Sequence, residues 1–266
     1  MKSALDEDLE FALGLADAAD EVTRERFRAL DLAVSLKADR THVTDADQAV
    51  ERALRERIER ERPGDAILGE EYGTVGDSPR QWILDPIDGT ANFLRGVPVW
   101  STLIALAIDG VPVLGVVSMP ALSRRWWAAT GLGAHTRDIG GGERSIRVSD
   151  VARLADASIA LSGIDRFEQA GQLDNYLALT RRVWRSRDYS DALPYMFVAE
   201  GVVDAAGEFD LQTYDMAALF PIIEEAGGTM TSFDGKPGPW HGSALASNTM
   251  LHSALIDSFT HPKEQL

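Results

Sequence analysis

The sequence predicts a mixed α+β/α/β protein in which strands are sandwiched between helices. The N-terminus has an amphipathic helical pattern, because apolar residues recur at three- and four-residue steps from Leu5 to Phe27. Asp109-Gly110 lies between two apolar segments and is a turn pair typical of an antiparallel hairpin. After about residue 150 the chain alternates between short strand-like and helical segments. Such alternation is typical of sheets covered by helices.

The elements of the first half follow from local patterns. A second helix is expected over 46–61, because Thr44 is a suitable N-cap and Pro63-Gly64 ends the helical pattern. Short apolar segments beside acids and turns predict mostly antiparallel strands over 66–68, 81–84, 102–108, 111–117, 124–129 and 146–148. A glycine-rich loop through residues 140–142 precedes the last of these strands.

The second half predicts further strands and helices. The strands are expected over 158–161, 203–206, 229–232 and 244–246, and the helices over 168–183, 191–201, 215–226 and up to Phe259. The chain has no internal repeat and no low-complexity linker. We therefore expect two packed subdomains, residues 1–150 and 151–266.

Composition and charge exclude several classes of function. The chain has 266 residues, 45% of them hydrophobic and 26% charged, which excludes intrinsic disorder as the main state. A net charge of −16 repels polyanions, so we expect no nucleic-acid partner and no membrane partner. The absence of cysteine excludes thiolate nucleophiles and cysteine-ligated metals. The acidic N-terminus lacks a signal-peptide pattern, and the longest charge-free runs are too short to span a membrane. We expect a cytoplasmic protein.

The segment 82–93 has the most informative pattern in the chain. An apolar strand ends at Asp85, and Pro86 keeps that residue extended, so its carboxylate projects past the strand. Asp88 follows three residues later, on the turn. Two carboxylates and the exposed carbonyl of Ile87 are oxygen ligands that can hold a divalent cation.

The residues after Asp88 indicate a phosphate site beside the cation site. Gly89 has no side chain to block close approach, and the amides of Gly89 and Thr90 would open a short helix, where a phosphate is favoured. The alternative is an ordinary surface Asp-Gly turn. That alternative does not explain Glu70, which ends the preceding strand in the same way, since clustered carboxylates are costly without cations between them.

Two further acids fit both a structural and a functional interpretation. Thr44 and Asp47 match the capping box, in which the acid accepts a hydrogen bond from the N-cap amide. Asp215 begins a helix, where the helix dipole favours an acid. Neither residue is a strong signal by itself.

Taken together, these motifs resemble the inositol monophosphatase-like family of magnesium-dependent, lithium-sensitive phosphomonoesterases. The resemblance covers about residues 5–255 and rests on the ordered segments 43–47, 69–71, 85–93, 214–218 and 225–228. The chain departs from the family at Tyr214 and Ala91, which lie beside expected ligands. The resemblance implies a layered αβαβα sandwich of the inositol monophosphatase/fructose-1,6-bisphosphatase type. It implies a mixed, mostly antiparallel N-terminal sheet, a smaller C-terminal α/β part and a homodimer.

The resemblance also implies a role for each acidic residue. Two or three Mg²⁺ ions per subunit are expected, with Mn²⁺ as a possible substitute, because oxygen-only ligands favour hard cations. The implied ligands are Glu70, Asp85 and the Ile87 carbonyl for one ion, Asp85, Asp88 and Asp215 for a second, and Glu70 with waters for a third. The implied catalytic set is Asp47 and Thr90, which orient and deprotonate the attacking water, together with Glu70, and phosphate is bound by Asp88, Gly89 and Thr90.

Substrate preference is expected to come from the second half. Where inositol-type members of the family have a small residue, this chain has Asp191, and an added carboxylate suits a cationic alcohol. The chain most resembles the histidinol-phosphatase branch, which implies hydrolysis of L-histidinol phosphate by direct attack of a metal-activated water. The expected substrate-binding residues are Arg187, Asp191, Glu208 and Asp215.

Several alternatives to this function stay open at the level of sequence. Within the class they are inositol-1-phosphate, fructose 1,6-bisphosphate and nucleotide 3′-phosphate as substrates. An alternative from a different class is a catalytically silent phosphate- or metal-binding regulatory module. Around Arg187, a surface cluster of ion pairs is the structural alternative to a substrate site.

Overall fold

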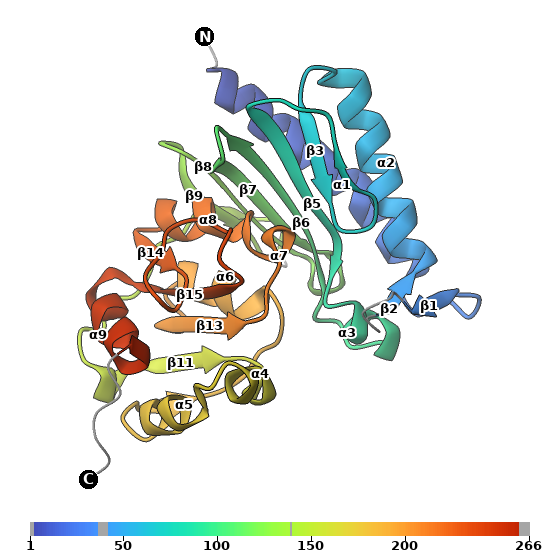
Figure 1. The fold of residues 1–266 in the computed structure, drawn as a ribbon. Coiled ribbons are helices and arrows are strands. Elements are labelled where there is room, and N and C mark those ends of the chain that lie inside the picture. Colours follow the sequence, from blue (N-terminus) through green and yellow to red (C-terminus); the bar gives the residue numbers. More distant parts are fainter. Residues whose placement is uncertain (1–2, 37–41, 139, 261–266) are drawn as a thin grey trace.

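Two long helices form the first layer of the molecule (Figure 1). The computed structural model describes residues 3–36, 42–138 and 140–260. Helix α1 (Ala4–Arg26) and helix α2 (Asp45–Glu61) both begin with a capping box, and both cover the same face of the large sheet. Their apolar faces pack with Trp82 of that sheet in one buried cluster. Both helices are confirmed; α1 was predicted from its apolar periodicity, and α2 from its N-cap and from Pro63-Gly64 at its end.

The second layer is an eight-stranded sheet. In spatial order its strands are β10 (Glu143–Ser145), β9 (Gly133–Arg137), β8 (Arg124–Ala129), β7 (Val111–Met119), β6 (Ser101–Ile108), β5 (Arg80–Asp88), β3 (Ala66–Gly69) and β4 (Gly73–Val75). Only β3 and β5 run parallel; all other neighbours in this sheet are antiparallel. The hairpin at Asp109-Gly110 is confirmed, with positive φ angles of 50° and 78°. A separate pair, β1 (Val34–Leu36) and β2 (His42–Thr44), precedes α2.

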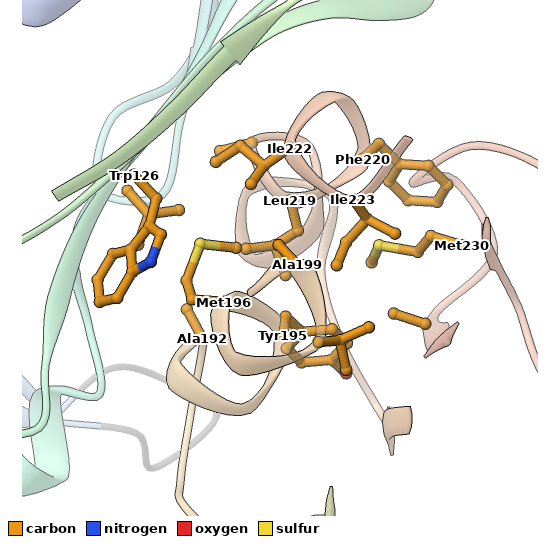
Figure 2. Packing of buried hydrophobic residues seen from close by; sticks show 14 of the residues in the cluster. Trp126, Ala192, Tyr195, Met196, Ala199, Leu219, Phe220, Ile222, Ile223 and Met230 are labelled. Carbon is orange, nitrogen blue, oxygen red and sulfur yellow. The ribbon is translucent and has the colours of Figure 1, made fainter. Parts of the chain in front are cut away.

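Short helices form the middle layer, on the opposite face of this sheet. They are α6 (Leu193–Ala199), α7 (Thr213–Met216) and α8 (Leu219–Glu225). Helix α8 approaches β7 so closely that a Cβ atom at Gly115 would lie 2.0 Å from the Ala218 carbonyl oxygen. Figure 2 shows Met196 of α6 extending toward Trp126 of β8, with Ile222 and Ile223 of α8 in the same cluster. This cluster joins the middle layer to both sheets.

A five-stranded sheet and three outer helices complete the sandwich. The strands, in spatial order, are β12 (Arg185–Ser186), β11 (Ser158–Leu161), β13 (Ala205–Phe209), β15 (Ser243–Asn248) and β14 (Gly228–Thr231). The helices are α4 (Ile164–Gln169), α5 (Leu173–Thr180) and α9 (Thr249–Thr260). Phe167, Leu179 and Phe259 of these helices pack in a third apolar cluster with the sheet. The predicted αβαβα layering is therefore confirmed.

Three of the predicted elements are wrong in detail. The single helix expected over 168–183 is two helices, because the chain turns at Gly171, whose φ is 69°. The helix expected over 215–226 begins earlier and is divided into α7 and α8. The strand expected over 146–148 lies earlier, as β10 over 143–145. Pairing with β9 ends just after it, where the Ile146 amide donates to the Ala134 carbonyl.

The remaining elements are short connections. They are α3 (Thr90–Arg95) and two 3₁₀ turns, η1 (Pro120–Leu122) and η2 (Leu154–Asp156). Within the described residues, no helix has both the length and the apolar character needed to cross a membrane. The subdomain boundary near residue 150 falls between the two sheets and stays a prediction.

Candidate active site

A cavity of about 760 Å³ opens where β3 and β5 end and the helices α3, α6 and α7 begin. Seven carboxylate side chains line it, and Arg166 is the one arginine among the described residues of its wall. The predicted site residues that line the cavity are Glu70, Asp85, Ile87, Asp88, Gly89, Thr90, Asp191, Glu208 and Asp215. The structure thus brings together residues from both halves of the chain.

Parallel pairing of two strands places the first two acids side by side. Gly69 of β3 is paired with Leu84 of β5, so Glu70 and Asp85 follow at the same edge of the sheet. The Glu70 amide donates to the Leu84 carbonyl at 3.2 Å. Buried Glu51 of α2 accepts the amide of the next residue at 2.7 Å and so fixes the turn after β3.

The turn after β5 positions Asp88 against the second half of the chain. The pairing of β5 with β6 shifts register between Asp85 and Asp88. One oxygen of Asp88, Oδ2, accepts hydrogen bonds from the Ser101 hydroxyl at 2.9 Å and from the Ala192 amide at 3.0 Å. Residue 89 must be glycine, because its φ is 82° and a Cβ atom there would lie 2.8 Å from Asp191 Oδ2.

Asp215 serves as a helix cap and also faces the cavity. Its Oδ2 accepts the Gln212 amide at 2.7 Å, which is part of a capping box at the start of α7. The same carboxyl group lies within hydrogen-bonding reach of Asp85. The capping interpretation of this acid is therefore compatible with its place in the site.

Burial, followed by the charges of neighbouring acids, raises the pKa values of the acids in the cavity. Burial, followed by the charges of Glu70, Asp88 and Asp215, raises the pKa of Asp85 well above its usual value. Burial raises the pKa of Asp215 to about 7. Asp85 is 2% exposed, and its Oδ1 atom has no hydrogen-bond partner among the described residues. A buried carboxylate oxygen of this kind is costly unless a cation or donor satisfies it.

This donor set fits a hard divalent cation. It consists of carboxylate oxygens and one backbone carbonyl, which suit Mg²⁺ or a similar ion. In the described part of the chain, no three His, Asp or Glu side chains are already oriented so that together they could coordinate one metal ion. Binding would therefore require the carboxylates to turn toward a shared ion, whose charge would offset both the cost of their burial and their mutual repulsion.

Asp47 lies behind the cavity wall and contacts it through Thr90. Its Oδ2 accepts the Thr44 amide at 2.8 Å, as the predicted capping box requires. Its Oδ1 lies 3.3 Å from the Thr90 hydroxyl, which also lies 3.0 Å from the Ile87 carbonyl. Burial raises the pKa of Asp47, so this carboxylate is a stronger base than an exposed one.

Asp191 lies at the cavity wall beside the turn at Gly89. The Asn92 amide and the Ser190 hydroxyl both donate to its Oδ2 at 2.7 Å. Burial raises the pKa of Glu208, which lies on β13, to about 8. At the same wall, Arg166 of α4 forms an ion pair with Asp210.

Arg187 is the one predicted substrate residue that the structure places away from the cavity. Its side chain is exposed and donates to the adjacent Ser186 carbonyl at 2.6 Å, and it is not part of the described wall. Sequence reasoning did not identify Arg166 or Tyr195 as wall residues. Arg166 lies on α4 and Tyr195 on α6, and neither residue belongs to a sequence motif that indicates a binding site.

We expect the stability of the metal-free protein to fall as pH rises. Asp215 and Glu208 have pKa values of about 7 and 8 in the folded protein, against about 4 in an unfolded chain. The folded state therefore holds protons that the unfolded state releases, and the free energy of unfolding decreases between about pH 4 and 8. Thermal unfolding should show a lower Tm at pH 8.5 than at pH 5.5, and Mg²⁺ should raise Tm more at pH 8.5.

The variant Glu208→Gln is the control for this pH dependence. It removes one of the two carboxyl groups, so its Tm should depend less steeply on pH. A Tm that rises with pH, or an Mg²⁺ effect equal at both pH values, would contradict the prediction.

Comparison with known proteins agrees with this fold and site. Residues 4–263 match the inositol monophosphatase family. Histidinol-phosphatases from Mycobacterium tuberculosis and Streptomyces coelicolor are each 52% identical to the chain, over 94% of it and 96% of their own length. An inositol-1-monophosphatase from Mycobacterium leprae is 39% identical, over 76% of this chain and 72% of its own.

Solved structures give the same result. The extragenic suppressor protein SuhB from Bartonella henselae superimposes with a TM-score of 0.87 at 30% identity, covering 97% of this chain and all of the other. An inositol monophosphatase from Zymomonas mobilis gives a TM-score of 0.84 at 32% identity, over 97% and 99% of the two chains. The chain therefore belongs to the inositol monophosphatase family.

Proposed function

We propose that this chain is a metal-dependent phosphomonoesterase that hydrolyses L-histidinol phosphate to L-histidinol and phosphate, with Mg²⁺ as its cation. The activity is supported by 52% identity to two histidinol-phosphatases over almost the whole chain. The observation that supports the substrate assignment is the carboxylate of Asp191, which the Asn92 amide holds at the cavity wall beside Gly89. A carboxylate there complements an alcohol that carries an ammonium group.

The acids at the ends of β3 and β5 are proposed to hold the cations. Glu70, Asp85 and the Ile87 carbonyl would hold one ion, Asp85, Asp88 and Asp215 a second, and Glu70 with waters a third. When bound, such ions stabilise the charge of the phosphoryl oxygens and lower the pKa of the attacking water. Asp88, with the amides of Gly89 and Thr90, would orient the phosphate at the start of α3.

Asp47 and Thr90 are proposed to prepare the nucleophile. The Thr90 hydroxyl hydrogen points to Asp47 or Ile87, so its oxygen can accept a hydrogen bond from a water in the cavity. The proton of that water passes to Asp47 through the Thr90 hydroxyl, because Asp47 Oδ1 is not used by the helix cap. Attack on phosphorus opposite the ester oxygen then breaks the P–O ester bond, and the departing alkoxide takes a proton from solvent water to give the alcohol, while Asp47 returns its proton to solvent.

The test is phosphate release from a panel of esters with Mg²⁺, using the wild type and Asp191→Asn. We expect the wild type to prefer L-histidinol phosphate over inositol-1-phosphate, fructose 1,6-bisphosphate and a nucleotide 3′-phosphate. Asn keeps the positive φ of 48° that residue 191 adopts, and it removes only the charge. For histidinol phosphate, the variant should lower kcat/KM by roughly 10 to 100-fold, because the substrate ammonium loses a buried ionic partner.

For inositol-1-phosphate, which has no ammonium group, Asp191→Asn should change kcat/KM much less. Comparable turnover of histidinol phosphate and inositol-1-phosphate by the wild type would contradict the substrate assignment. A wild type that hydrolyses none of the esters would instead support a silent binding module.

Two broader features belong to the proposal. They are a homodimer, which the family resemblance implies, and a cytoplasmic location, which the sequence patterns predict. Inositol-1-phosphatase activity is the weaker alternative, because the inositol-1-monophosphatase from Mycobacterium leprae is 39% identical to this chain, against 52% for the two histidinol-phosphatases.

A further inference from the structure

The hydroxyl group of Tyr195 is buried at the cavity wall and has no hydrogen-bond partner among the described residues. Tyr195 lies on α6, four residues after Asp191, and is 2% exposed. Figure 2 shows its ring on the side of α6 that faces away from Trp126. The hydroxyl oxygen makes no hydrogen bond to any described residue, although Tyr195 is part of the cavity wall. Buried hydroxyl groups in folded proteins are nearly always hydrogen-bonded, so this one requires an explanation.

The surroundings of this hydroxyl group keep it a donor. Burial, followed by the charges of Glu208, Asp88 and Asp215, raises its pKa well above the usual value. The group therefore stays protonated across the neutral range. Asp88 and Asp215 each use one oxygen for a backbone amide, and the cation proposal assigns both residues to metal. Glu208 is the acidic neighbour that has no such role.

The cavity wall therefore presents a donor and an acceptor close to each other. Tyr195 supplies a neutral O–H group from α6, and Glu208 supplies a carboxyl group from β13, which packs against α6. Asp191 is different, because both of its described donors bond to Oδ2, which leaves Oδ1 for a ligand. The wall thus offers one acceptor site at Asp191 and a mixed donor and acceptor site at Tyr195 and Glu208.

We propose that Tyr195 is a specificity-determining residue whose hydroxyl group donates a hydrogen bond to the imidazole ring of the substrate, with Glu208 accepting from the other ring nitrogen. This inference rests on the proposed function. A neutral imidazole has one nitrogen that accepts and one that donates, so it requires both kinds of partner. An ammonium group only donates, so it matches Asp191 and cannot accept a hydrogen bond from the Tyr195 hydroxyl group.

Chemical selectivity also follows from this pairing. A site built to hydrogen-bond a polar group rejects an analogue that lacks the group, since its own buried polar atoms are then left unpaired. Tyr195 and Glu208 would discriminate against amino alcohol phosphates whose side chain is apolar. The ester of L-phenylalaninol is the informative comparison, because it keeps the ammonium group and an aromatic ring but has no ring nitrogen.

The experiment compares the wild type with Tyr195→Phe on the phosphate esters of L-histidinol and L-phenylalaninol, with Mg²⁺ present. We expect kcat/KM for histidinol phosphate to fall by about tenfold, mainly through KM, because one buried hydrogen bond is lost. For phenylalaninol phosphate we expect no change. Calorimetry with the free alcohols should show the same pattern, with about tenfold weaker binding of L-histidinol only.

Tyr189→Phe is the matched control. Tyr189 is partly buried and packs edge-on against Phe197 with ring centroids 5.3 Å apart, and it is outside the described wall of the cavity. This variant should leave both substrates unaffected.

Any other result for Tyr195→Phe would contradict the inference, and the pattern of losses over the two esters would show why. An equal loss for both esters in Tyr195→Phe would mean that the hydroxyl acts on the phosphate or on folding, and no loss would mean that it does not contact the imidazole. A wild type that fails to hydrolyse histidinol phosphate would overturn the proposed function itself, which the Tyr195→Phe comparison alone does not test.

Discussion

Replacing Asp85 with Asn is expected to abolish hydrolysis and cation binding together. Asp85 lies between Glu70, Asp88 and Asp215, and all three of their charges act on it. Asn has the same shape but no charge, so the cations would lose the ligand that the first two proposed ions share. We expect kcat to fall by at least about 10³-fold, the order of loss that follows removal of a principal electrostatic group from an active site.

The stability of the metal-free protein should change in the opposite direction. In the folded protein, the Asp85 carboxyl group is buried among like charges and one of its oxygens is unsatisfied among the described residues. Removing that charge relieves repulsion, so the Tm of metal-free Asp85→Asn should equal or exceed that of the wild type. Mg²⁺ should then no longer raise the Tm. Calorimetric titration with Mg²⁺, phosphate release and thermal unfolding measure the three effects.

Asp20→Asn is the control that separates loss of a buried aspartate charge in general from loss of the proposed cation ligand. Asp20 is also a buried aspartate, but it pairs with Arg125 at 2.8 Å, at the other side of the large sheet from the cavity. This variant should lose stability and retain Mg²⁺ binding and turnover. If Asp85→Asn bound Mg²⁺ with wild-type affinity and remained active, the assignment of the cation site would be wrong.

The convergence of the acids could be predicted because it depends on local rules. Parallel strands end at one edge of a sheet, so acids that directly follow two such strands lie close together, as Glu70 and Asp85 do. The turn at Gly89 and the capping box of Thr44 and Asp47 are likewise encoded within a few residues. The αβαβα layering followed from the same local patterns together with the resemblance.

The residues that the sequence did not reveal are brought in by packing between distant elements. Tyr195 reaches the cavity because α6 packs between the two sheets, and Glu51 supports the turn after β3 from α2. Neither contact has a local signal. The position of Arg187 was unpredictable for a different reason. Ser190 and Asp191 have positive φ angles of 72° and 48°, and this reversal separates the exposed Arg187 from Asp191 at the wall.

The second large effect is expected for Asp47→Asn, which should remove catalysis while leaving the fold and the cations in place. An Asn side chain can still accept the Thr44 amide with its carbonyl oxygen, so the cap of α2 changes by no more than about 1 kcal/mol. It cannot take a proton from the water that Thr90 orients. General base catalysis contributes about 10² to 10⁴-fold, so kcat should fall by that order, with KM and Mg²⁺ affinity nearly unchanged.

The chain contains its own control for the two roles of Asp47. Asp6 occupies the same N3 position in the capping box of α1, where it accepts the Ser3 amide at 2.8 Å, and it is not part of the described cavity wall. Asp6→Asn should therefore cause a comparable small change in unfolding free energy and no change in kcat. If both variants lost only stability, Asp47 would be a helix cap and nothing more. If only Asp47→Asn lost turnover, the same carboxylate would serve both purposes, because its Oδ2 faces the helix and its Oδ1 faces Thr90.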